Sequence, residues 1–351
     1  MTGPLRIAVV APVATSVPPP LSGSIETMTA LLTDGLVARG HDVTLFGTGS
    51  SSTRARLHAT FARGYRDDAA LWPWELCELF NLSAAVERAA SFDLIHYQAE
   101  YTPVGSAFGR LMHTPLLQTV HHAPGPEEIA LWSAYPDAPF VAVSGEQARL
   151  MAGLNVVATI HHGVDGTAFT FRPEADDYLL FLGRFTEGKG VLTAIEVARR
   201  VGLRLLLAAE ENDYYREAVA PLVDGVRIQY VGEVGSAEKV ALLGGARSLL
   251  YPVQAAEPFG LVITEAMACG TPVAALDRGA VSELVEHGVT GGVFPSLDAL
   301  VTGLPAVMAL PRGRVRASAL ERFGVDRMVG AYETVYRRLT GQGPVPRKED
   351  R

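Results

Sequence analysis

The sequence predicts an α/β protein with two Rossmann-like lobes, each built on a parallel sheet. The chain has 351 residues, which is enough for two domains that each bury a sizeable core. Short runs rich in Val, Ile and Leu, typical of doubly buried parallel strands, alternate with longer helical patterns. Hydrophobic residues make up 48% of the chain and charged residues 19%, a composition that argues against disorder.

Composition also excludes several classes of function. The net charge of −8 disfavours non-specific binding to nucleic acid, so no nucleic-acid partner is expected. No apolar run is long enough to span a bilayer, and the N-terminus lacks the layout of a signal peptide, so we expect a cytoplasmic location. Cys77 and Cys269 are expected to be buried free thiols. Of the 30 basic residues only Lys189, Lys239 and Lys348 are lysines, which leaves 27 arginines and indicates a GC-rich genome.

The first lobe is predicted over residues 1–165. It opens with a strand, a helix and a second strand, over residues 5–13, 24–40 and 41–46. Gly23 is expected at the N-cap of the helix, with Glu26 supplying half of a capping box. The loop around Gly23 and Ser24 would then face the carboxyl edge of the sheet, where ligands bind in such folds. The loop is not a G-x-G-x-x-G fingerprint, and a plain tight connection explains Gly23 equally well.

Two pairs of adjacent histidines lie in predicted strands of this lobe, His121–His122 and His161–His162. The remaining strands are expected over residues 92–98, 115–122, 139–144 and 156–165. Neighbouring residues on a strand point to opposite faces, so neither pair can chelate one ion, and no zinc-type spacing supports them. We therefore expect no metal site. A histidine that holds the end of a strand by hydrogen bonds is the simplest role for these residues.

The second lobe is predicted over residues 166–322, and a polar connection at residues 167–177 precedes its first strand. Its first strand leads into the segment GRFTEGKG, in which glycines let the backbone approach a ligand closely. Arg184 can fork two phosphate oxygens, and Lys189 supplies a mobile point charge. Either cation alone would be an ordinary exposed charge. Because both follow one strand, and no Asp-x-Asp metal motif is evident, the pair favours a diphosphate site.

The segment EPFGLVITEAMACGTPV places two carboxylates, Glu257 and Glu265, eight positions apart. A helix is expected to begin near Pro258 or Phe259, because proline suits the first helical position. The start of a helix offers unpaired N–H groups to an anion or to hydroxyls. Glu265 lies four residues after Leu261 and would share its helix face. Two glutamates that merely cap and solvate an ordinary helix are the alternative.

These motifs resemble those of the retaining, nucleotide-sugar-dependent glycosyltransferases of family 4. The resemblance covers nearly the whole chain and implies the GT-B fold, with two parallel sheets facing a central cleft. It also implies that Glu257 meets the donor sugar, that Glu265 binds the ribose hydroxyls and that Val234 contacts the base through its backbone. It places His121 under the donor sugar, or His122 if the alignment slips by one residue.

The resemblance thus implies catalytic roles for His121 and Glu257. The substrate-binding residues that it implies are Gly23, Ser24, Arg184, Lys189, Val234, Phe259, Gly260, Leu261, Val262 and Glu265. The family usually has a second glycine where this chain has Ser24. A C-terminal helix over residues 323–340, which carries a clear apolar stripe, is expected to cross back to the first lobe and to leave a frayed tail over residues 341–351.

The expected reaction is the transfer of a sugar from a UDP- or GDP-sugar to an acceptor hydroxyl, without a metal and with retention of configuration. No carboxylate in the sequence is recognisable as a nucleophile. Attack by the acceptor on the sugar face that the diphosphate leaves is therefore favoured over double displacement. No cofactor is expected besides the donor substrate. An epimerase with the same two lobes and a non-catalytic sugar-binding protein are the alternatives.

The acceptor is expected to be a glycan or a natural product. Composition and compact length favour an actinobacterial enzyme of secondary metabolism that decorates an oligosaccharide antibiotic of the avilamycin type. Glycosylation of lipids or of the cell envelope is the alternative, because Trp72 and Trp74 follow an arginine-rich stretch and could give peripheral contact with a membrane. A solvated face with two half-buried indoles explains the same residues.

Overall fold

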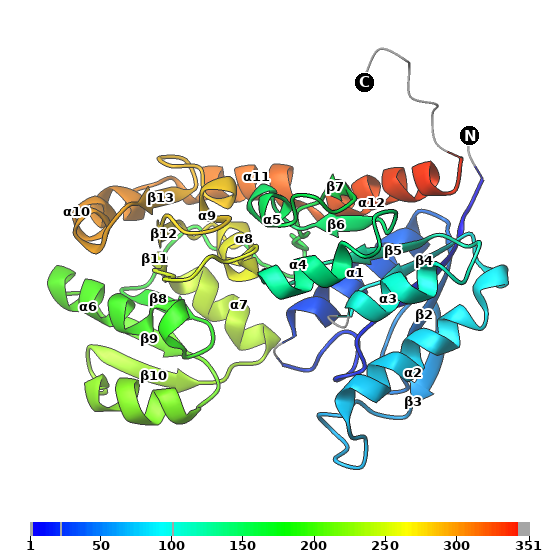
Figure 1. Cartoon of the computed structure of the whole chain (residues 1–351). Helices are drawn as coiled ribbons and strands as arrows, with labels where there is room; N and C mark the ends of the chain where they lie inside the picture. Colours follow the sequence, from blue (N-terminus) through cyan, green and yellow to red (C-terminus); the bar gives the residue numbers. More distant parts are fainter. Residues whose placement is uncertain (1–2, 22, 100–101, 343–351) are drawn as a thin grey trace. The chain divides into compact units, whose positions relative to one another are not determined.

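The computed structural model describes residues 3–21, 23–99 and 102–342. They form two compact units, each with one parallel sheet (Figure 1). The first unit comprises the chain up to Gly163 together with the segment from Val325, and the second comprises Val164–Gly324. The predicted fold class is therefore confirmed, including the return of the last helix to the first unit. Most of the expected tail, residues 343–351, lies outside the described residues.

The sheet of the first unit has seven strands in the order β3-β2-β1-β4-β5-β6-β7. Their bounds are Arg6–Val10 (β1), Asp42–Thr48 (β2), Arg56–Phe61 (β3), Leu94–Tyr97 (β4), Leu116–Thr119 (β5), Phe140–Ala142 (β6) and Val156–Thr159 (β7). All pairs are parallel, so the carboxyl ends of the strands lie at one edge. The segments that follow β4 and β5 therefore emerge side by side.

The helices of this unit are Ser24–Ala38 (α1), Trp74–Val86 (α2), Thr102–Gly109 (α3), Pro126–Trp132 (α4), Gly145–Leu150 (α5) and Val325–Leu339 (α12), with a 3-10 turn at Ala89–Ser91 (η1). Successive residues of β4 point to opposite faces of the sheet. Ile95 and Tyr97 pack in one core with Leu82 of α2. His96 lies on the other face, where its ring contacts Tyr336 of α12.

The docking of α12 confirms the predicted apolar stripe. Its buried residues are Met328, Val329, Tyr332, Val335 and Tyr336. Gly35 of α1 allows a close approach, because a Cβ at that position would lie 2.5 Å from a methyl carbon of Val329. Arg39, at the end of α1, donates to the carbonyl oxygen of Asp326 at 2.9 Å. The last helix is thus an integral part of the first unit.

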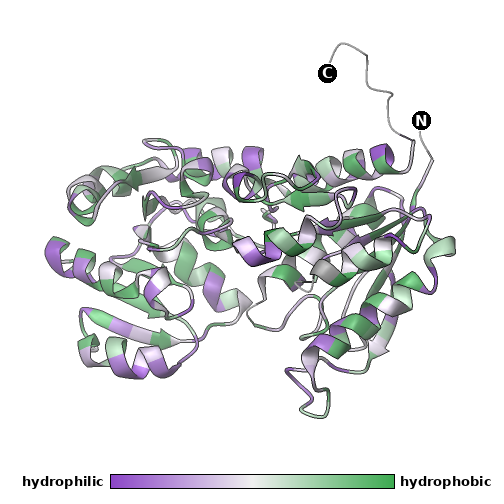
Figure 2. Ribbon diagram, in the orientation of Figure 1, coloured by the Kyte–Doolittle hydropathy of each residue, from purple (hydrophilic) through white to green (hydrophobic). Residues whose placement is uncertain are grey.

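The second unit has six parallel strands in the order β10-β9-β8-β11-β12-β13. They are Leu179–Leu182 (β8), Leu205–Ala208 (β9), Ile228–Gly232 (β10), Ser248–Tyr251 (β11), Val273–Leu276 (β12) and Gly291–Phe294 (β13). Its α-helices are Val191–Val201 (α6), Ser236–Gly245 (α7), Leu261–Ala268 (α8), Val281–Leu284 (α9), Leu297–Met308 (α10) and Arg312–Phe323 (α11). Figure 2 shows mostly hydrophobic strands and helices along which hydrophilic and hydrophobic residues alternate.

Three parts of the fold differ from the sequence prediction. The hydrophobic pattern of the sequence is poor over residues 50–82 and predicts no definite element, yet β3 and most of α2 lie there. The segment DYYREAVAPL, residues 213–222, predicts a helix, but the structure has a π turn at Tyr215–Val219 (η3) followed by a 3-10 turn at Ala220–Leu222 (η4). Pro221 explains this break, because it has no N–H to continue an α-helical ladder. Two helices of the second unit, α10 and α11, were also not predicted.

Candidate functional site

The segment GRFTEGKG lies after β8 and is joined to the chain that precedes Glu257. It includes a 3-10 turn at Glu187–Lys189 (η2), which ends at Gly190. Gly190 has a φ of 75°, and a Cβ there would lie 1.9 Å from the carbonyl oxygen of Pro252. The carbonyl of Gly188 accepts a hydrogen bond from the N–H of Gln254 at 2.8 Å. Gly190 thus combines a left-handed conformation with a close approach of two backbones, and both require glycine.

This junction brings Lys189 and Glu257 together in an ion pair. Both side chains are about one-fifth exposed, at 22% for Lys189 and 20% for Glu257. The hydroxyl of Tyr251, at the end of β11, also hydrogen-bonds the Glu257 carboxylate. Burial is the main cause that raises the pKa of Tyr251, and the neighbouring carboxylate raises it further. Tyr251 therefore donates a hydrogen bond to Glu257 without losing its proton, and it was not identified from the sequence.

Arg184 differs from Lys189 in its surroundings. It is exposed and has no hydrogen-bond or ion-pair partner in the part of the chain that the structure describes. The two cations of the segment are thus one paired lysine and one guanidinium that is open to an incoming anion. A guanidinium can offer two parallel donors to such an anion.

Helix α8 begins later than predicted. Its first residue is Leu261, and its N-cap is Gly260 with a φ of 104°, so Pro258 and Phe259 precede the helix. Phe259 is only 2% exposed and packs edge-on against Phe323. The chain therefore turns inward at Phe259 before the helix can start. Ile263 donates to the carbonyl of Gly260 at 3.0 Å.

The first turn of α8 presents two backbone donors. The N–H groups of Leu261 and Val262 have no acceptor among the described residues. Groups of this kind carry the partial positive charge of a helix N-terminus. These two residues follow Glu257 by four and five positions, and the helix that carries them begins two or three residues later than predicted.

Glu265 lies in the second turn of α8 and is 7% exposed. Its carboxylate forms an ion pair with Lys239 of α7, with 2.7 Å between Nζ and Oε1. The same ammonium group lies 5.4 Å from the centre of the Phe169 ring. Val234, the predicted base contact, is half-buried between β10 and α7. Neither Lys239 nor Phe169 was predicted as a neighbour of Glu265.

Two arginines of α11 support the far end of α8. Arg316 donates to the carbonyl groups of Ala268 and of Gly166, the latter at 2.7 Å. Arg312 donates to Thr271 Oγ1 at 2.7 Å. Cations at this position complement the partial negative charge at the C-terminus of a helix. They keep α8, and hence Glu265, in register with the sheet.

In the first unit, Gly23 is the N-cap of α1, as predicted, and Ser24 is the first residue of that helix. A Cβ on Gly23 would lie 2.8 Å from Oε2 of Glu26 and 2.9 Å from the ring of Pro19. The carbonyl of Gly23 accepts from the Thr27 hydroxyl at 2.7 Å. A side chain at this position would have to displace Pro19 and Glu26, which agrees with the plain tight connection considered for Gly23. Ser24 is exposed.

His121 and His122 follow β5 and have different partners. His121 Nε2 lies 2.8 Å from Gln98 Oε1, and its ring stacks on that of His162 with 5.3 Å between centres. His122 Nε2 lies 2.7 Å from Glu128 Oε1 of α4. Burial, followed by the nearby His122, lowers the pKa of His121 to about 3. His121 is therefore neutral over the physiological range.

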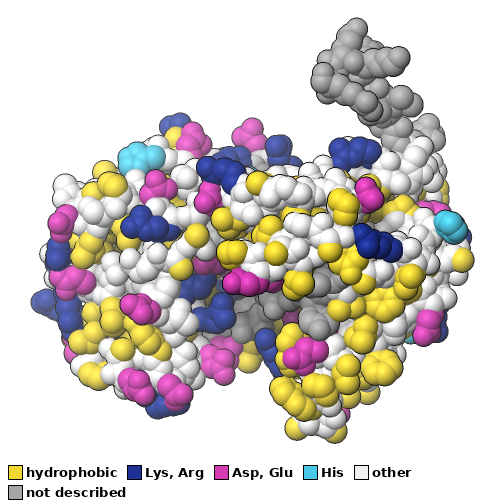
Figure 3. Space-filling view, viewed as in Figure 1, with side chains coloured by type: hydrophobic (Ala, Val, Ile, Leu, Met, Phe, Trp, Pro, Cys, Tyr) yellow, Lys and Arg dark blue, Asp and Glu magenta, His cyan; other side chains and the backbone are white. Residues whose placement is uncertain are grey.

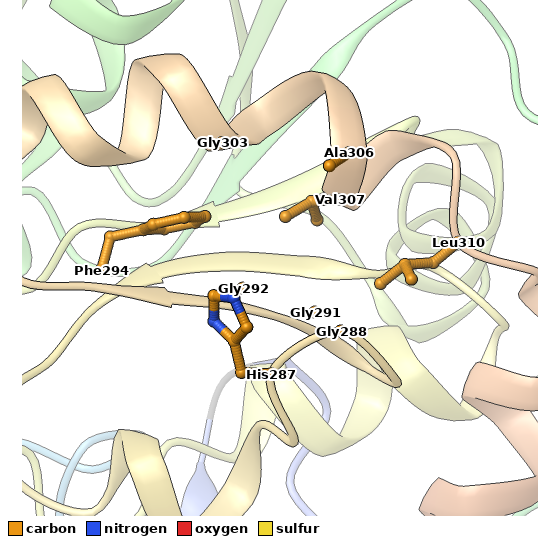
Figure 4. A pocket seen from close by; sticks show the side chains of 9 residues that line it. All are labelled: His287, Gly288, Gly291, Gly292, Phe294, Gly303, Ala306, Val307 and Leu310. Atoms are coloured by element: carbon orange, nitrogen blue, oxygen red, sulfur yellow. The ribbon is translucent and has the colours of Figure 1, made fainter.

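Two further observations concern possible ligand sites. Among the described residues, no group of three His, Cys, Asp or Glu side chains is arranged to hold a metal ion. A cavity of about 160 Å³ opens between β13 and α10 (Figure 4). It is lined by His287, Gly288, Gly291, Gly292, Phe294, Gly303, Ala306, Val307 and Leu310. None is a predicted site residue, and a mostly apolar lining does not suit a nucleotide.

An exposed hydrophobic face lies on α2 and the loop before it (Figure 3). Trp72 is 74% exposed, Leu76 47% and Phe80 60%. These residues follow each other at intervals of four, so Leu76 and Phe80 share a helix face. Trp74 is half-buried against Tyr65, but Trp72 is not, so only one of the two indoles fits the expectation of a half-buried pair.

Comparison with known proteins decides the family. Residues 25–168 match the model of Glycosyltransferase Family 4, and residues 168–319 match the model of Glycosyl transferases group 1. The chain belongs to glycosyltransferase family 4. Together the two matches span both units and include the residues Arg184, Lys189, Glu257 and Glu265.

The chain is similar to several known glycosyltransferases. It is 32% identical over 176 residues to the phosphatidyl-myo-inositol mannosyltransferase of Mycolicibacterium smegmatis, a match covering 46% of this chain and 45% of that protein. The chain spans about half the length of the curated relatives it matches. The structure of AviGT4, a glycosyltransferase involved in avilamycin A biosynthesis, is 27% identical, with a TM-score of 0.74, and the match covers 96% of this chain and 98% of that one.

A structure of Anabaena Alr3699/HepE in complex with UDP and glucose has the same fold. It is 18% identical, with a TM-score of 0.73, and the match covers 95% of this chain and 100% of that one. No helix in the described parts of the chain has both the length and the apolar character needed to cross a membrane.

Proposed function

We propose that this chain is a retaining glycosyltransferase that works without a metal and moves a sugar from a nucleoside diphosphate to an acceptor hydroxyl. The observation that carries the proposal is the arrangement around Glu257. Lys189 is paired with this glutamate, exposed Arg184 belongs to the same segment as Lys189, and the first turn of α8 adds free N–H groups. Cations and helix-start donors of this kind suit a diphosphate.

Arg184, Lys189 and the N–H groups of Leu261 and Val262 would stabilise the charge that grows on the departing diphosphate. One well-placed donor of this type is worth about 3–4 kcal/mol of transition-state stabilisation. Lys189 would then share its charge between Glu257 and the phosphate oxygens. Side chains supply the positive charge in this scheme, so no metal ion is required.

The two glutamates would position the donor. Glu265, held by Lys239, would accept hydrogen bonds from the ribose hydroxyls, and Val234 would contact the base through its backbone. Glu257 would orient the sugar, and Tyr251 would hold Glu257 in place. Gly23 and Ser24 of the first unit would line the approach of phosphate or acceptor. His121 would accept a hydrogen bond from the sugar.

Retention would follow from attack on the face that the diphosphate leaves. The bond between the anomeric carbon and the phosphate oxygen breaks, and the acceptor oxygen bonds to the same face of that carbon. The acceptor proton passes to the departing phosphate oxygen. The neutral state of His121 supports this scheme, because a neutral imidazole is a poor general acid at neutral pH. A trapped covalent glycosyl–enzyme adduct would contradict it.

Two acceptor classes are supported by different observations. The likeness to AviGT4 over nearly the whole of both chains favours a natural-product acceptor in antibiotic biosynthesis. The exposed face of Trp72, Leu76 and Phe80 favours instead an acceptor met at a membrane surface, as the name of the mannosyltransferase relative suggests for that protein. Of the two, the match to AviGT4 covers more of this chain.

The test is a thermal-shift screen of UDP and GDP, followed by turnover assays with sugars carried on the better nucleotide. Saturation at 100 times the dissociation constant stabilises by about 2.7 kcal/mol, which such a screen detects. A transferase releases the nucleoside diphosphate faster when an acceptor is added. An epimerase would convert the donor without acceptor, and a binding protein would show the shift without turnover. Either result would overturn the proposal.

A further inference from the structure

A chain of hydrogen-bonded side chains leads from His121 into the interior of the first unit. Its members are buried, and neither the sequence motifs nor the family resemblance identified them: His96, Gln98, Thr119, Tyr332 and Tyr336. Residues two apart on a strand share a face. The side chains that extend from β4 and from β5 on this face therefore meet beneath α12.

The first link fixes the proton of His121. Oε1 of Gln98 lies 2.8 Å from Nε2 of His121. An amide oxygen only accepts hydrogen bonds, so Nε2 carries the proton. The ring is neutral, so Nδ1 keeps its lone pair. Nδ1 has no hydrogen-bond partner among the described residues, which leaves it as an acceptor for a hydroxyl group.

The second link fixes Gln98. Its amide nitrogen lies 3.2 Å from each ring nitrogen of His96. The His96 ring cannot turn freely, because Nδ1 lies 2.6 Å from the hydroxyl of Tyr336 and Nε2 lies 2.8 Å from Oγ1 of Thr119. Thr119 in turn lies 3.0 Å from the hydroxyl of Tyr332. Two tyrosines of α12 thus complete the chain of hydrogen bonds.

No member of this chain gains or loses a proton near neutral pH. Burial, followed by the nearby His121, lowers the pKa of His96 to about 3. Burial likewise lowers the pKa of His162, which stacks on His121, and raises the pKa of Tyr332 and of Tyr336. The links can therefore act on His121 through orientation and not through supply of a proton.

We propose that Gln98 is a positioning residue that holds His121 in the tautomer protonated at Nε2, with Nδ1 as the acceptor for a hydroxyl of the donor sugar. Tyr336 holds Gln98 in place through His96, so the C-terminal helix takes part in shaping the site. This rests on the proposed function, in which His121 meets the sugar. Packing of α12 alone would need the tyrosine rings but not their hydroxyl groups.

The decisive pair of variants is Gln98→Met and Gln98→Glu. The ¹⁵N shifts of the labelled imidazole rings report the tautomer, and the His121→Asn variant assigns the signal. In the Met variant we expect mixed tautomers and a fall in kcat of about 100-fold, the usual cost of a misplacement of about 1 Å. The dissociation constant for the free nucleoside diphosphate should stay the same, because that ligand carries no sugar.

The Glu variant should behave differently. A carboxylate also accepts from Nε2, so the tautomer and turnover should be restored at high pH. The negative charge raises the pKa of His121. Turnover should therefore fall as the pH drops through this new pKa. The pH profile of the wild-type protein should show no such fall from His121.

Tyr336→Phe tests the outer link and has a matched control in Tyr332→Phe. Both variants keep an aromatic ring in the packing of α12, but the Tyr332 hydroxyl reaches His96 only through Thr119. Loss of one hydrogen bond corresponds to about 2- to 10-fold in kcat, and we expect this loss for Tyr336→Phe and a smaller loss for Tyr332→Phe. Equal effects of the two would overturn the role of Tyr336.

Two results would overturn the role of Gln98. One is a wild-type spectrum in which His121 is protonated at Nδ1. The other is a Met variant that keeps the wild-type tautomer, even if its stability falls. If the wild-type protein transfers no sugar, the proposed function fails, whereas the ¹⁵N spectra still decide whether Gln98 fixes the ring.

Discussion

In the second unit, each motif glutamate is paired with a lysine, whereas in the first unit His121 is joined only to uncharged groups. Glu257 binds Lys189 and Glu265 binds Lys239. The hydrogen-bonded chain behind His121 contains one histidine, a glutamine, a threonine and two tyrosines, all neutral near pH 7. One unit therefore offers mobile charge, and the other offers fixed dipoles.

This difference indicates that the two units have different roles in the proposed reaction. A departing diphosphate carries several charges and needs cations that can follow it. A sugar hydroxyl is neutral and needs a single acceptor in a fixed place. The rarity of lysine sharpens the point, since Lys189 and Lys239 are two of only three lysines in the sequence. A flexible ammonium group is kept where a planar guanidinium would be less able to move between partners.

The largest effect should come from removing the charge of Lys189. We expect Lys189→Met to lower kcat by about 100- to 1000-fold, the typical cost of one lost donor to a developing charge. The far-ultraviolet circular dichroism should be unchanged, because the side chain is not part of a core. Arg199→Met, which removes an exposed cation from α6, serves as the control. If turnover of Lys189→Met stays within about 2-fold of wild type, the second unit does not supply the mobile charge proposed for it.

The free energy of unfolding should fall in acid, because His96 of the first unit stays neutral in the folded protein. The folded pKa of His96 lies at about 3, and an unfolded histidine titrates near 6.5, so below pH 6.5 the unfolded chain binds a proton that the folded chain does not. Each such histidine lowers the free energy of unfolding by about 1.4 kcal/mol per pH unit as the pH falls.

The measurement is urea unfolding at pH 7 and pH 5, compared with the variant His96→Gln. Between about pH 6.5 and pH 5 the wild-type protein should lose about 2 kcal/mol more than the variant. The comparison is made between pH slopes, so a variant that is less stable at every pH still gives a valid result. Identical slopes would show that folding does not lower the pKa of His96.

Glu265→Gln should have a smaller effect, and on binding. The amide keeps the shape of the carboxylate but removes its charge and leaves the ammonium group of Lys239 without its partner. A weaker hydrogen bond to ribose of about 1.4 kcal/mol corresponds to a 10-fold higher dissociation constant for the nucleoside diphosphate. Isothermal titration measures this, and the 2′-deoxy nucleotide should lose affinity less in the variant than in the wild-type protein.

The smallest effect is expected from Tyr251→Phe. The ring remains buried, and only the hydrogen bond to Glu257 is lost. A net loss of about 0.5–1.5 kcal/mol should lower kcat by roughly 2- to 10-fold. The nucleoside diphosphate should bind as before, since it carries no sugar for Glu257 to orient. An effect on nucleotide affinity alone would assign Tyr251 to the diphosphate instead.

The sequence predicted those features that depend on local pattern. The apolar stripe of α12, the parallel strands and the N-cap at Gly23 all follow from periodicity or from the chemistry of single positions. The start of α8 was placed too early, because proline preference at Pro258 was outweighed by burial of Phe259. A local preference is worth less than the burial of an aromatic ring.

Contacts between distant residues were not predictable in this way. Tyr336 meets His96 across 240 positions of sequence, and Lys239 meets Glu265 from another helix. Neither contact leaves a spacing that a single sequence can reveal. The scarcity of lysine was the one usable signal, because a residue kept in a chain otherwise rich in arginine suggests a need for its particular chemistry.

The membership of α12 in the first unit has a consequence for biosynthesis. The second unit is one continuous stretch, Val164–Gly324, so it can fold once that stretch has left the ribosome. The first unit begins earlier but lacks Tyr332 and Tyr336 until the segment from Val325 has been made. Until then no tyrosine hydroxyl holds Nδ1 of His96, and the lobe synthesised first is the one completed last.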